Sequence, residues 1–185
     1  MTGKSHIATG IATAAIFADG YALLSHTADD SMYFHIATKI SEVLIHTELP
    51  LFVYVPLCVF LYLLGVILPD IDYPYSMIGK HLYLPFGHRT WTHCWLPLTI
   101  CGIAGIWCHS LWFLGLGMFV HILFDSFSAS GIQWLYPAKI KYRCPLYHTS
   151  SISEYVVMII WVMIAILFTL GTLQHIFHLV TISFT

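Results

Sequence analysis

The stretch LPLFVYVPLCVFLYLLGVILPDID, residues 49–72, decides the fold of this chain. Residues 49–68 are apolar and uncharged, and their length matches the roughly 20 residues that a helix needs to cross a bilayer. Pro50 stands at the start of this run, where a missing amide donor costs least, and Pro69 ends it. The stretch therefore predicts a transmembrane helix over 49–68, followed directly by two aspartates.

The composition of the whole chain agrees with a membrane protein. Hydrophobic residues make up 58% of the sequence and charged residues 9%, whereas soluble domains are about half apolar and a quarter charged. The mean hydropathy is +0.80. The net charge of −2 and the scattered basic residues leave no basic patch for nucleic acid, so that class of partner is excluded.

Further apolar runs predict four more helices, over residues 5–24, 92–108, 111–127 and 154–173. With the helix over 49–68, they predict an all-α, polytopic membrane bundle of about five crossings in a single domain, 1–185. Apolar residues at helical spacing within 25–48 are typical of a short amphipathic surface helix. An ordinary connecting helix explains that spacing equally well.

The basic residues predict the orientation of the bundle. Cytoplasmic loops are enriched in Lys and Arg, and six of the seven basic residues fall on one side of a five-crossing trace. These six are Lys4, Lys80, Arg89, Lys139, Lys141 and Arg143, and the other side has Lys39. We therefore expect an integral protein of the bacterial inner membrane, with its N-terminus in the cytoplasm and its C-terminus outside.

The same trace gathers histidines and aspartates at the cytoplasmic face. They are His6, Asp70, Asp72, His88, His93, His121 and Asp125. The orientation follows from Lys and Arg alone, so the convergence of these other residues supports a functional site independently.

Two pairs among these residues have the spacing of metal ligands. His121 and Asp125 are four residues apart, so they share one helix face, although a histidine bonded to an aspartate inside a bundle has the same spacing. Ionisable groups are expensive in a membrane, which favours a functional role. Asp70 and Asp72 follow a helix end, where one could bind an ion and the other cap the turn, or both could be ordinary turn residues.

A third pair, His88 and His93, depends on local geometry. Five residues on a helix turn about 140°, so the two can face one ion only if the helix begins between them, capped by Thr90 or Thr92. Arg89 lies between them and could bind a phosphate or a carboxylate through two hydrogen bonds. Anchoring at the membrane surface is the alternative role for Arg89.

The donor set predicts the class of metal. Histidine nitrogen with aspartate oxygen suits Zn²⁺, and also Mn²⁺ or Fe²⁺, better than Ca²⁺ or Mg²⁺. We expect one to three divalent ions, with zinc the first choice. Such an ion lowers the pKa of bound water until hydroxide forms near neutrality, which favours a hydrolytic site.

Taken together, the motifs resemble the YdjM-like family of inner-membrane metal-dependent hydrolases. They are residues 3–6 (GKSH), 68–74 (LPDIDYP) with Ser76 and Gly79, 87–93 (GHRTWTH), His121 through Asp125 to Gly131, 135–137 (LYP) and Glu154. The resemblance covers most of the chain up to Glu154, and its specificity lies in the ordered set.

The chain departs from the family pattern at Thr90, Cys94 and Ser128-Ala129, where the family usually has glycine, serine and threonine-proline. No proposed ligand is lost, but the shape of the loop near Arg89 is expected to differ from that in the family. The order of ligands is also similar to that of zinc-dependent phospholipase C and the S1/P1 nucleases, which implies phosphoester hydrolysis by analogy. Those enzymes use an N-terminal residue as a ligand, and this is not carried over because five residues precede His6.

The leading hypothesis is thus a membrane-bound metal-dependent hydrolase acting on a phosphoester such as a phospholipid headgroup. The expected ligands are His6, Asp70, His88, His93, His121 and Asp125. Asp72 would orient a histidine or act as general base, and Arg89 would bind phosphate. Glu154 would contact and orient the ligands without binding the metal itself. A non-catalytic structural or regulatory metal protein is the alternative, and a metal transporter is the third.

Overall fold

A computed structural model describes residues 1–25, 35, 38, 39, 42, 49–76, 78–81 and 87–183. The α-helices in these ranges are α1 (Gly3–Ser25), α3 (Leu51–Ile67), α4 (Trp95–Ala104), α5 (Ser110–Ser126) and α6 (Ile152–Ser183). Short 3₁₀ helices are η1 (Leu68–Asp72), η2 (Gly79–His81) and η3 (Trp91–His93). The described ranges contain no strand longer than an isolated bridge, which confirms the all-helical fold. The predicted surface helix within 25–48 lies largely outside the described residues.

Three helices of the described chain are long and apolar enough to cross a membrane, over Gly3–Ser25, Leu51–Asp72 and Ile152–His178. Helices α4 and α5 are apolar but shorter. The predicted helix over 92–108 was too long, because residues 91–93 form η3 and the amide of Trp95 bonds the carbonyl of Trp134, at 3.1 Å, instead of a preceding turn. In contrast, α6 runs ten residues beyond the predicted end at 173.

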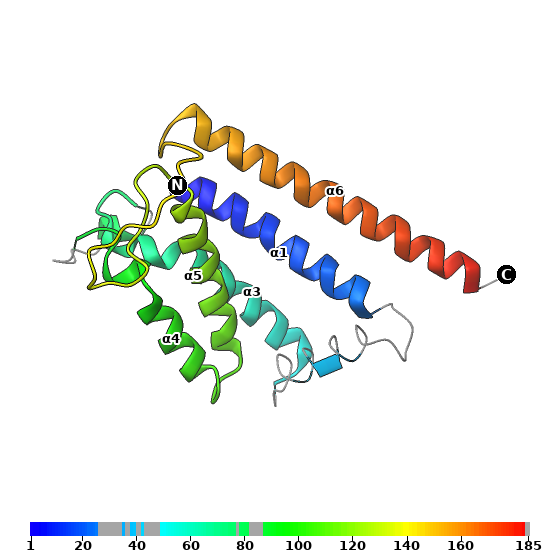
Figure 1. The fold of residues 1–185 in the computed structure, drawn as a ribbon. Coiled ribbons are helices and arrows are strands. Elements are labelled where there is room, and N and C mark those ends of the chain that lie inside the picture. Colours follow the sequence, from blue (N-terminus) through cyan, green and yellow to red (C-terminus); the bar gives the residue numbers. More distant parts are fainter. Residues whose placement is uncertain are drawn as a thin grey trace.

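The helices lie in two groups (Figure 1). Helices α1 and α6 run side by side along one flank, while α3 and α5 cross beneath them and α4 forms a hairpin with α5. The two chain termini lie at opposite ends of the bundle. The start of α1, the end of α3, the end of α5 and the start of α6 gather at the same end, which we call the site end.

Two glycines let α3 and α5 touch backbone to backbone. A Cβ added at Gly65 would lie 2.2 Å from the carbonyl oxygen of Leu114, and one added at Gly117 would lie 2.1 Å from that of Tyr62. Small residues at such crossings let helices in a membrane approach closely, where van der Waals packing replaces the hydrophobic effect. The contact fixes the register of α5 against the end of α3.

Side-chain hydrogen bonds join α1 to α6. The indole of Trp161 donates to the hydroxyl of Thr13, at 3.0 Å, and the hydroxyl of Thr169 donates to the carboxylate of Asp19. The rest of α6 exposes large apolar side chains along its length, among them Ile159 and Leu167. Such a surface is typical of a helix that faces lipid.

Candidate metal centre

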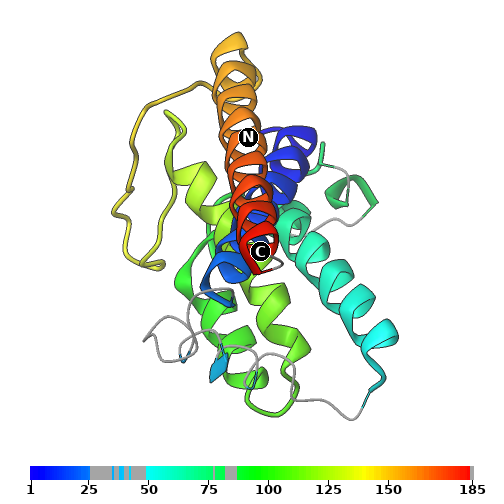
Figure 2. The ribbon, with the colours of Figure 1, turned by 90° about the vertical axis from the view of Figure 1, so that its right-hand side faces the viewer.

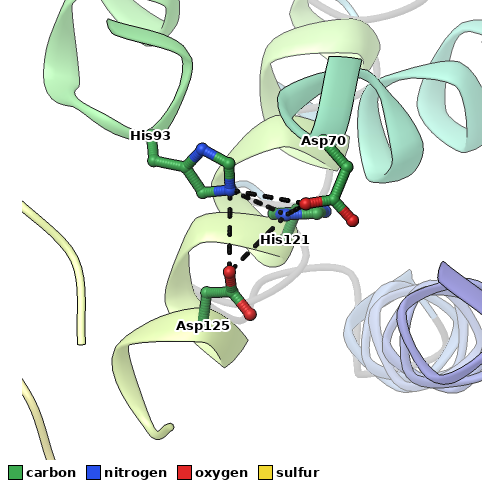
Figure 3. A group of neighbouring side chains, drawn as sticks. All are labelled: Asp70, His93, His121 and Asp125. Carbon is green, nitrogen blue, oxygen red and sulfur yellow. Dashed lines mark hydrogen bonds and ion pairs between the residues drawn. The ribbon is translucent and has the colours of Figure 1, made fainter. Parts of the chain in front are cut away.

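Four buried side chains from three elements converge at the site end (Figure 3). Asp70 comes from η1, His93 from η3, and His121 and Asp125 from consecutive turns of α5. Each offers one ligand atom, and these four atoms lie within 4.8 Å of one another. The close crossing of α3 and α5 brings Asp70 to His121, since η1 continues directly from α3.

The ring of His121 is oriented by the backbone of α3. Its Nδ1 lies 2.7 Å from the carbonyl oxygen of Val66, which can only accept, so Nδ1 carries the proton. That leaves Nε2 facing the cluster, 3.5 Å from Asp70 Oδ1 and 4.0 Å from Asp125 Oδ2. A metal-binding histidine is commonly held in this way, with its other nitrogen bonded to a carbonyl or carboxylate.

A chain of hydrogen bonds orients His93. The Thr92 hydroxyl donates to Asp72 Oδ2 at 2.6 Å, so it accepts from His93 Nδ1, which lies 2.8 Å away. His93 Nε2 then faces Asp70 Oδ1 at 3.7 Å and Asp125 Oδ2 at 3.6 Å. Burial by itself would lower the pKa of His93, but the nearby carboxylates of Asp70, Asp72 and Asp125 outweigh it and raise the pKa to about 9.

Asp72 connects this cluster to the protein surface. Its Oδ1 lies 2.7 Å from Nδ1 of His88, and its Oδ2 accepts the backbone amide of Arg89 at 3.1 Å. Asp72, His88 and His93 form a second group with the spacing of metal ligands. The side chain of His88 is 30% exposed, so this group reaches solvent while the first does not.

His6 adjoins the first group from α1. Its ring stacks on that of His121, with centroids 3.6 Å apart, and its Nε2 lies 3.2 Å from Asp125 Oδ1. Neither ring nitrogen has a hydrogen-bond partner in hydrogen-bonding geometry among the described residues. Asp125 Oδ2 has none either, although it lies 3.0 Å from the guanidinium of Arg89. Buried polar atoms without partners are rare and costly. Buried nitrogen and oxygen atoms that lack hydrogen bonds and lie together suit a bound cation, so the residues fit a metal ion.

Arg89 has an unusual backbone and points inward. Its φ of 63° lies in the left-handed region, which side chains other than glycine rarely adopt and which is often found at functional sites. Its guanidinium lies 3.0 Å from Asp125 Oδ2 and donates to the hydroxyl of Ser128 at 3.1 Å. Only 13% of the side chain is exposed. Arg89 therefore places a positive charge beside the cluster.

Glu154 is buried at the start of α6, and its two oxygens accept hydrogen bonds from residues just before α1 and just before α6. One accepts the amide and the hydroxyl of Thr2, at 2.7 and 2.9 Å, and the other accepts the amide of Ser150 at 2.7 Å. Glu154 thus holds the first turn of α1, which carries His6, against the start of α6. The amino group of Met1 contacts Asp125 at the same end.

Comparison with known proteins agrees with the resemblance drawn from the motifs. The family model for the YdjM inner membrane protein matches residues 1–182. The chain belongs to this family. Its relatives include uncharacterized protein YvsG of Bacillus subtilis (strain 168), which is 28% identical over 180 residues, covering 85% of this chain and 88% of YvsG.

Inner membrane protein YdjM of Escherichia coli (strain K12) and that of Shigella flexneri are each 30% identical over 100 residues, which is 45% of this chain and 51% of each relative. No solved structure matches the chain. Membership of the YdjM family and the three apolar helices support a membrane location for this protein. The names of these relatives state no reaction.

In this YdjM-family chain, the capping expected at Thr90 or Thr92 is wrong. Helix α4 begins after both histidines of the 88–93 segment, and neither η3 nor α4 has a side-chain cap. The Thr92 hydroxyl donates a hydrogen bond to Asp72 instead. As a result, His88 and His93 contact opposite oxygens of Asp72 from a turn, and His93 alone of the two reaches the four-residue group.

Sequence reasoning missed several partners of the YdjM-family site, and three of them orient its side chains. The hydroxyl of Thr92 and that of buried Ser128 hold His93 and Arg89, and the carbonyl of Val66 holds His121. A hydroxyl residue next to a candidate histidine was a usable signal for Thr92. A backbone carbonyl leaves no signal in the sequence, because every residue has one.

Proposed function

We propose that this YdjM-family protein is a membrane-bound, metal-dependent hydrolase of a phosphoester such as a phospholipid headgroup. One observation carries the proposal: two imidazoles and two carboxylates, all buried, present their ligand atoms to one another at one end of an apolar bundle. Charged groups are costly in such a place unless they pair or bind a cation. The donor set suits Zn²⁺ first and Mn²⁺ or Fe²⁺ next, with one to three ions.

The roles follow from the contacts. Asp70, His93, His121 and Asp125 would hold an ion, with His6 completing it from α1, and His88 would bind a further ion beside Asp72. When bound, the metal supplies a water of lowered pKa and neutralises charge on phosphoester oxygens.

The remaining residues act around these ligands. Asp72 orients His88 and His93 and is the candidate general base. Arg89 provides the positive charge that binds phosphate. Glu154 is a positioning residue for His6.

The site end is proposed to face the cytoplasm of a bacterial cell, with the C-terminus outside. Six of the seven basic residues support this orientation, through the preference of Lys and Arg for the cytoplasmic side. The residues of the site lie near the start of α1 and the end of α3, and lipid headgroups are expected at the ends of membrane-spanning helices. A lipid substrate would reach such a site from the membrane without leaving it.

The test is metal content measured together with hydrolysis. The full chain is expressed with ample zinc, purified in a nonionic detergent, and assayed for bound metal and for headgroup release from phospholipids. We expect stoichiometric metal, activity that a chelator abolishes and zinc restores, and loss of both in His121→Gln. The matched control is His178→Gln, an exposed histidine on α6, which should keep both. Purified protein without stoichiometric metal refutes the proposal.

A structural ion is the second candidate, favoured by the burial of all four residues in the first group. Structural sites tend to be closed, while catalytic sites keep a position for water. Stoichiometric metal without any phosphoesterase activity, and unfolding of the bundle on chelation, would select this alternative. A transporter, the third hypothesis, is disfavoured because the candidate ligands gather at one end of the bundle.

A further inference from the structure

We propose that residues 138–146, which we call the basic arm, bind the headgroups of anionic phospholipids. The arm lies within the segment between α5 and α6, at the site end, and carries Lys139, Lys141 and Arg143. The inference concerns lipid binding and requires neither a bound metal nor hydrolysis. It therefore stands or falls separately from the proposed reaction.

The arm is held to the end of α5 by backbone hydrogen bonds. Ile132 and Tyr142 exchange amide and carbonyl bonds, at 3.0 and 2.8 Å, and the amide of Cys144 donates to the carbonyl of Ser126 at 2.8 Å. Gly131, with φ of 62°, makes the turn possible, since a Cβ there would lie 2.6 Å from the carbonyl of Tyr142. The position of the arm is thus fixed by the helix that carries Asp125.

The positive charge of the arm is not neutralised nearby. All three basic side chains are exposed, and none forms an ion pair with a described residue. Residues 131–153 contain no Asp or Glu, although the whole chain has a net charge of −2. A local charge of about +3 in a protein of opposite net charge is an attractive site for anions.

The arm also has the apolar groups expected of a membrane-interface segment. Lys139, Lys141 and Arg143 are spaced two apart in an exposed segment without helix. Ile140, between the two lysines, and Leu146, just after Arg143, are 57% and 58% exposed. Exposed apolar side chains can enter the edge of the lipid layer while the cations meet phosphate groups.

The position of the basic arm makes membrane lipid its expected partner. Figure 2 shows the segment after α5, in yellow, running outside the helices before it returns to the start of α6. Two of the three spanning candidates, α1 and α6, begin at this end, so the end lies at a membrane surface. In a basic segment next to a spanning helix, each Lys or Arg near the surface raises the affinity for anionic lipids by about fivefold.

The experiment compares two variants that lose the same charge. One replaces Lys139, Lys141 and Arg143 by Gln, and the matched control replaces Lys4, Lys39 and Lys80, which are also exposed. Each full chain, in nonionic detergent, is titrated with phosphatidylglycerol or phosphatidylcholine, and bound lipid is counted by native mass spectrometry. Metal content and helicity are measured on the same samples to verify that both variants fold.

We expect the unmodified chain to prefer phosphatidylglycerol, and the arm variant to bind it roughly 100-fold more weakly at low salt. The control should lose clearly less than the arm variant, because its three lysines are dispersed and Lys39 already pairs with Glu42. The preference of the unmodified chain should shrink at high salt because of screening. A conservative Lys139→Arg, Lys141→Arg variant should keep the preference, which guards against misfolding of the Gln variant. Equal binding of the two lipids by the unmodified chain, or equal losses in both triple variants, overturns the proposal.

Discussion

The two helix pairs of the bundle are held together by different means. Helices α3 and α5 meet through Gly65 and Gly117, where neighbouring backbone atoms leave no room for a Cβ. Helices α1 and α6 meet through hydrogen bonds of side chains, Thr13 with Trp161 and Asp19 with Thr169. The α3–α5 pair positions Asp70, His121 and Asp125. The α1–α6 pair contributes His6 and Glu154, which holds the start of α1 in place.

This difference shows how a membrane bundle can place a polar site accurately. Backbone contact at a glycine fixes the distance and register of two helices, whereas a hydrogen bond between side chains tolerates adjustment. The cluster depends on the first kind of contact, since Val66, next to Gly65, also orients His121. We therefore expect substitutions in the α3–α5 pair to affect metal binding and substitutions in the α1–α6 hydrogen bonds to leave it nearly unchanged.

The largest contrast is expected between two aspartates, one from each of these pairs. Asp125→Asn keeps the size of the side chain but removes a ligand charge, so metal affinity should fall by at least about 100-fold, beyond the usual effect of losing a supporting residue. Asp19→Asn in the α1–α6 pair still accepts the hydrogen bond from Thr169 and should keep the metal. Metal content and helicity are measured side by side.

Asp125→Asn also leaves the guanidinium of Arg89 without its ion-pair partner, which by itself can destabilise the bundle. Asp70→Asn, whose carboxylate faces His93 and His121, provides a second test of the same cluster. Full metal occupancy in a folded Asp125→Asn variant would remove Asp125 from the ligands.

Metal affinity should also depend on pH, because the candidate ligand His93 is titratable and lies beside the α3–α5 pair. With its pKa raised to about 9, metal-free His93 is protonated at neutral pH, and a metal must displace that proton. The affinity should therefore rise with pH, by roughly tenfold per unit between pH 6 and 8, and level off near pH 9. Chelator competition at several pH values measures this.

The control for this pH effect is Asp72→Asn, since Asp72 helps to raise the pKa of His93. In that variant the levelling-off should move to lower pH. An affinity that does not change between pH 6 and 8 contradicts a role for His93 as a ligand.

Glycine substitutions test the crossing itself. Gly117→Ala would push a Cβ into the carbonyl of Tyr62, so the helices must separate, at a cost of about 1–3 kcal/mol in stability and with weaker metal binding. Gly20→Ala on α1 meets no atom within 4 Å and should change neither. Thermal unfolding in detergent and metal content decide the matter, and equal behaviour of the two variants would show that the crossing does not position the site.

The smallest effect is expected from the α1–α6 hydrogen bond. Thr13→Val removes the acceptor of the Trp161 indole, and such interhelical bonds in membranes are worth about 0.6 kcal/mol on average. Metal content should stay at the level of the unmodified chain, with a shift of only a few degrees in unfolding temperature. A loss of metal in Thr13→Val would mean that the second pair positions the cluster as strongly as the first.

The sequence by itself determined the class of fold and the family. Uncharged apolar runs such as 49–68 are sufficient to predict membrane helices, because a bilayer requires a definite length of apolar helix. The ordered motifs from His6 to Glu154 likewise predicted the YdjM family, and the i, i+4 pair His121 and Asp125 needed only helix periodicity.

Tertiary structure decided which of the candidate residues meet. His88 and His93 are equivalent in the sequence, yet the turn before α4 sends His93 to the buried group and leaves His88 at the surface beside Asp72. Arg89 adopts a left-handed backbone conformation, and its side chain turns inward to Asp125. Loop geometry of this kind depends on contacts between residues far apart in the chain, and a local pattern does not encode those contacts.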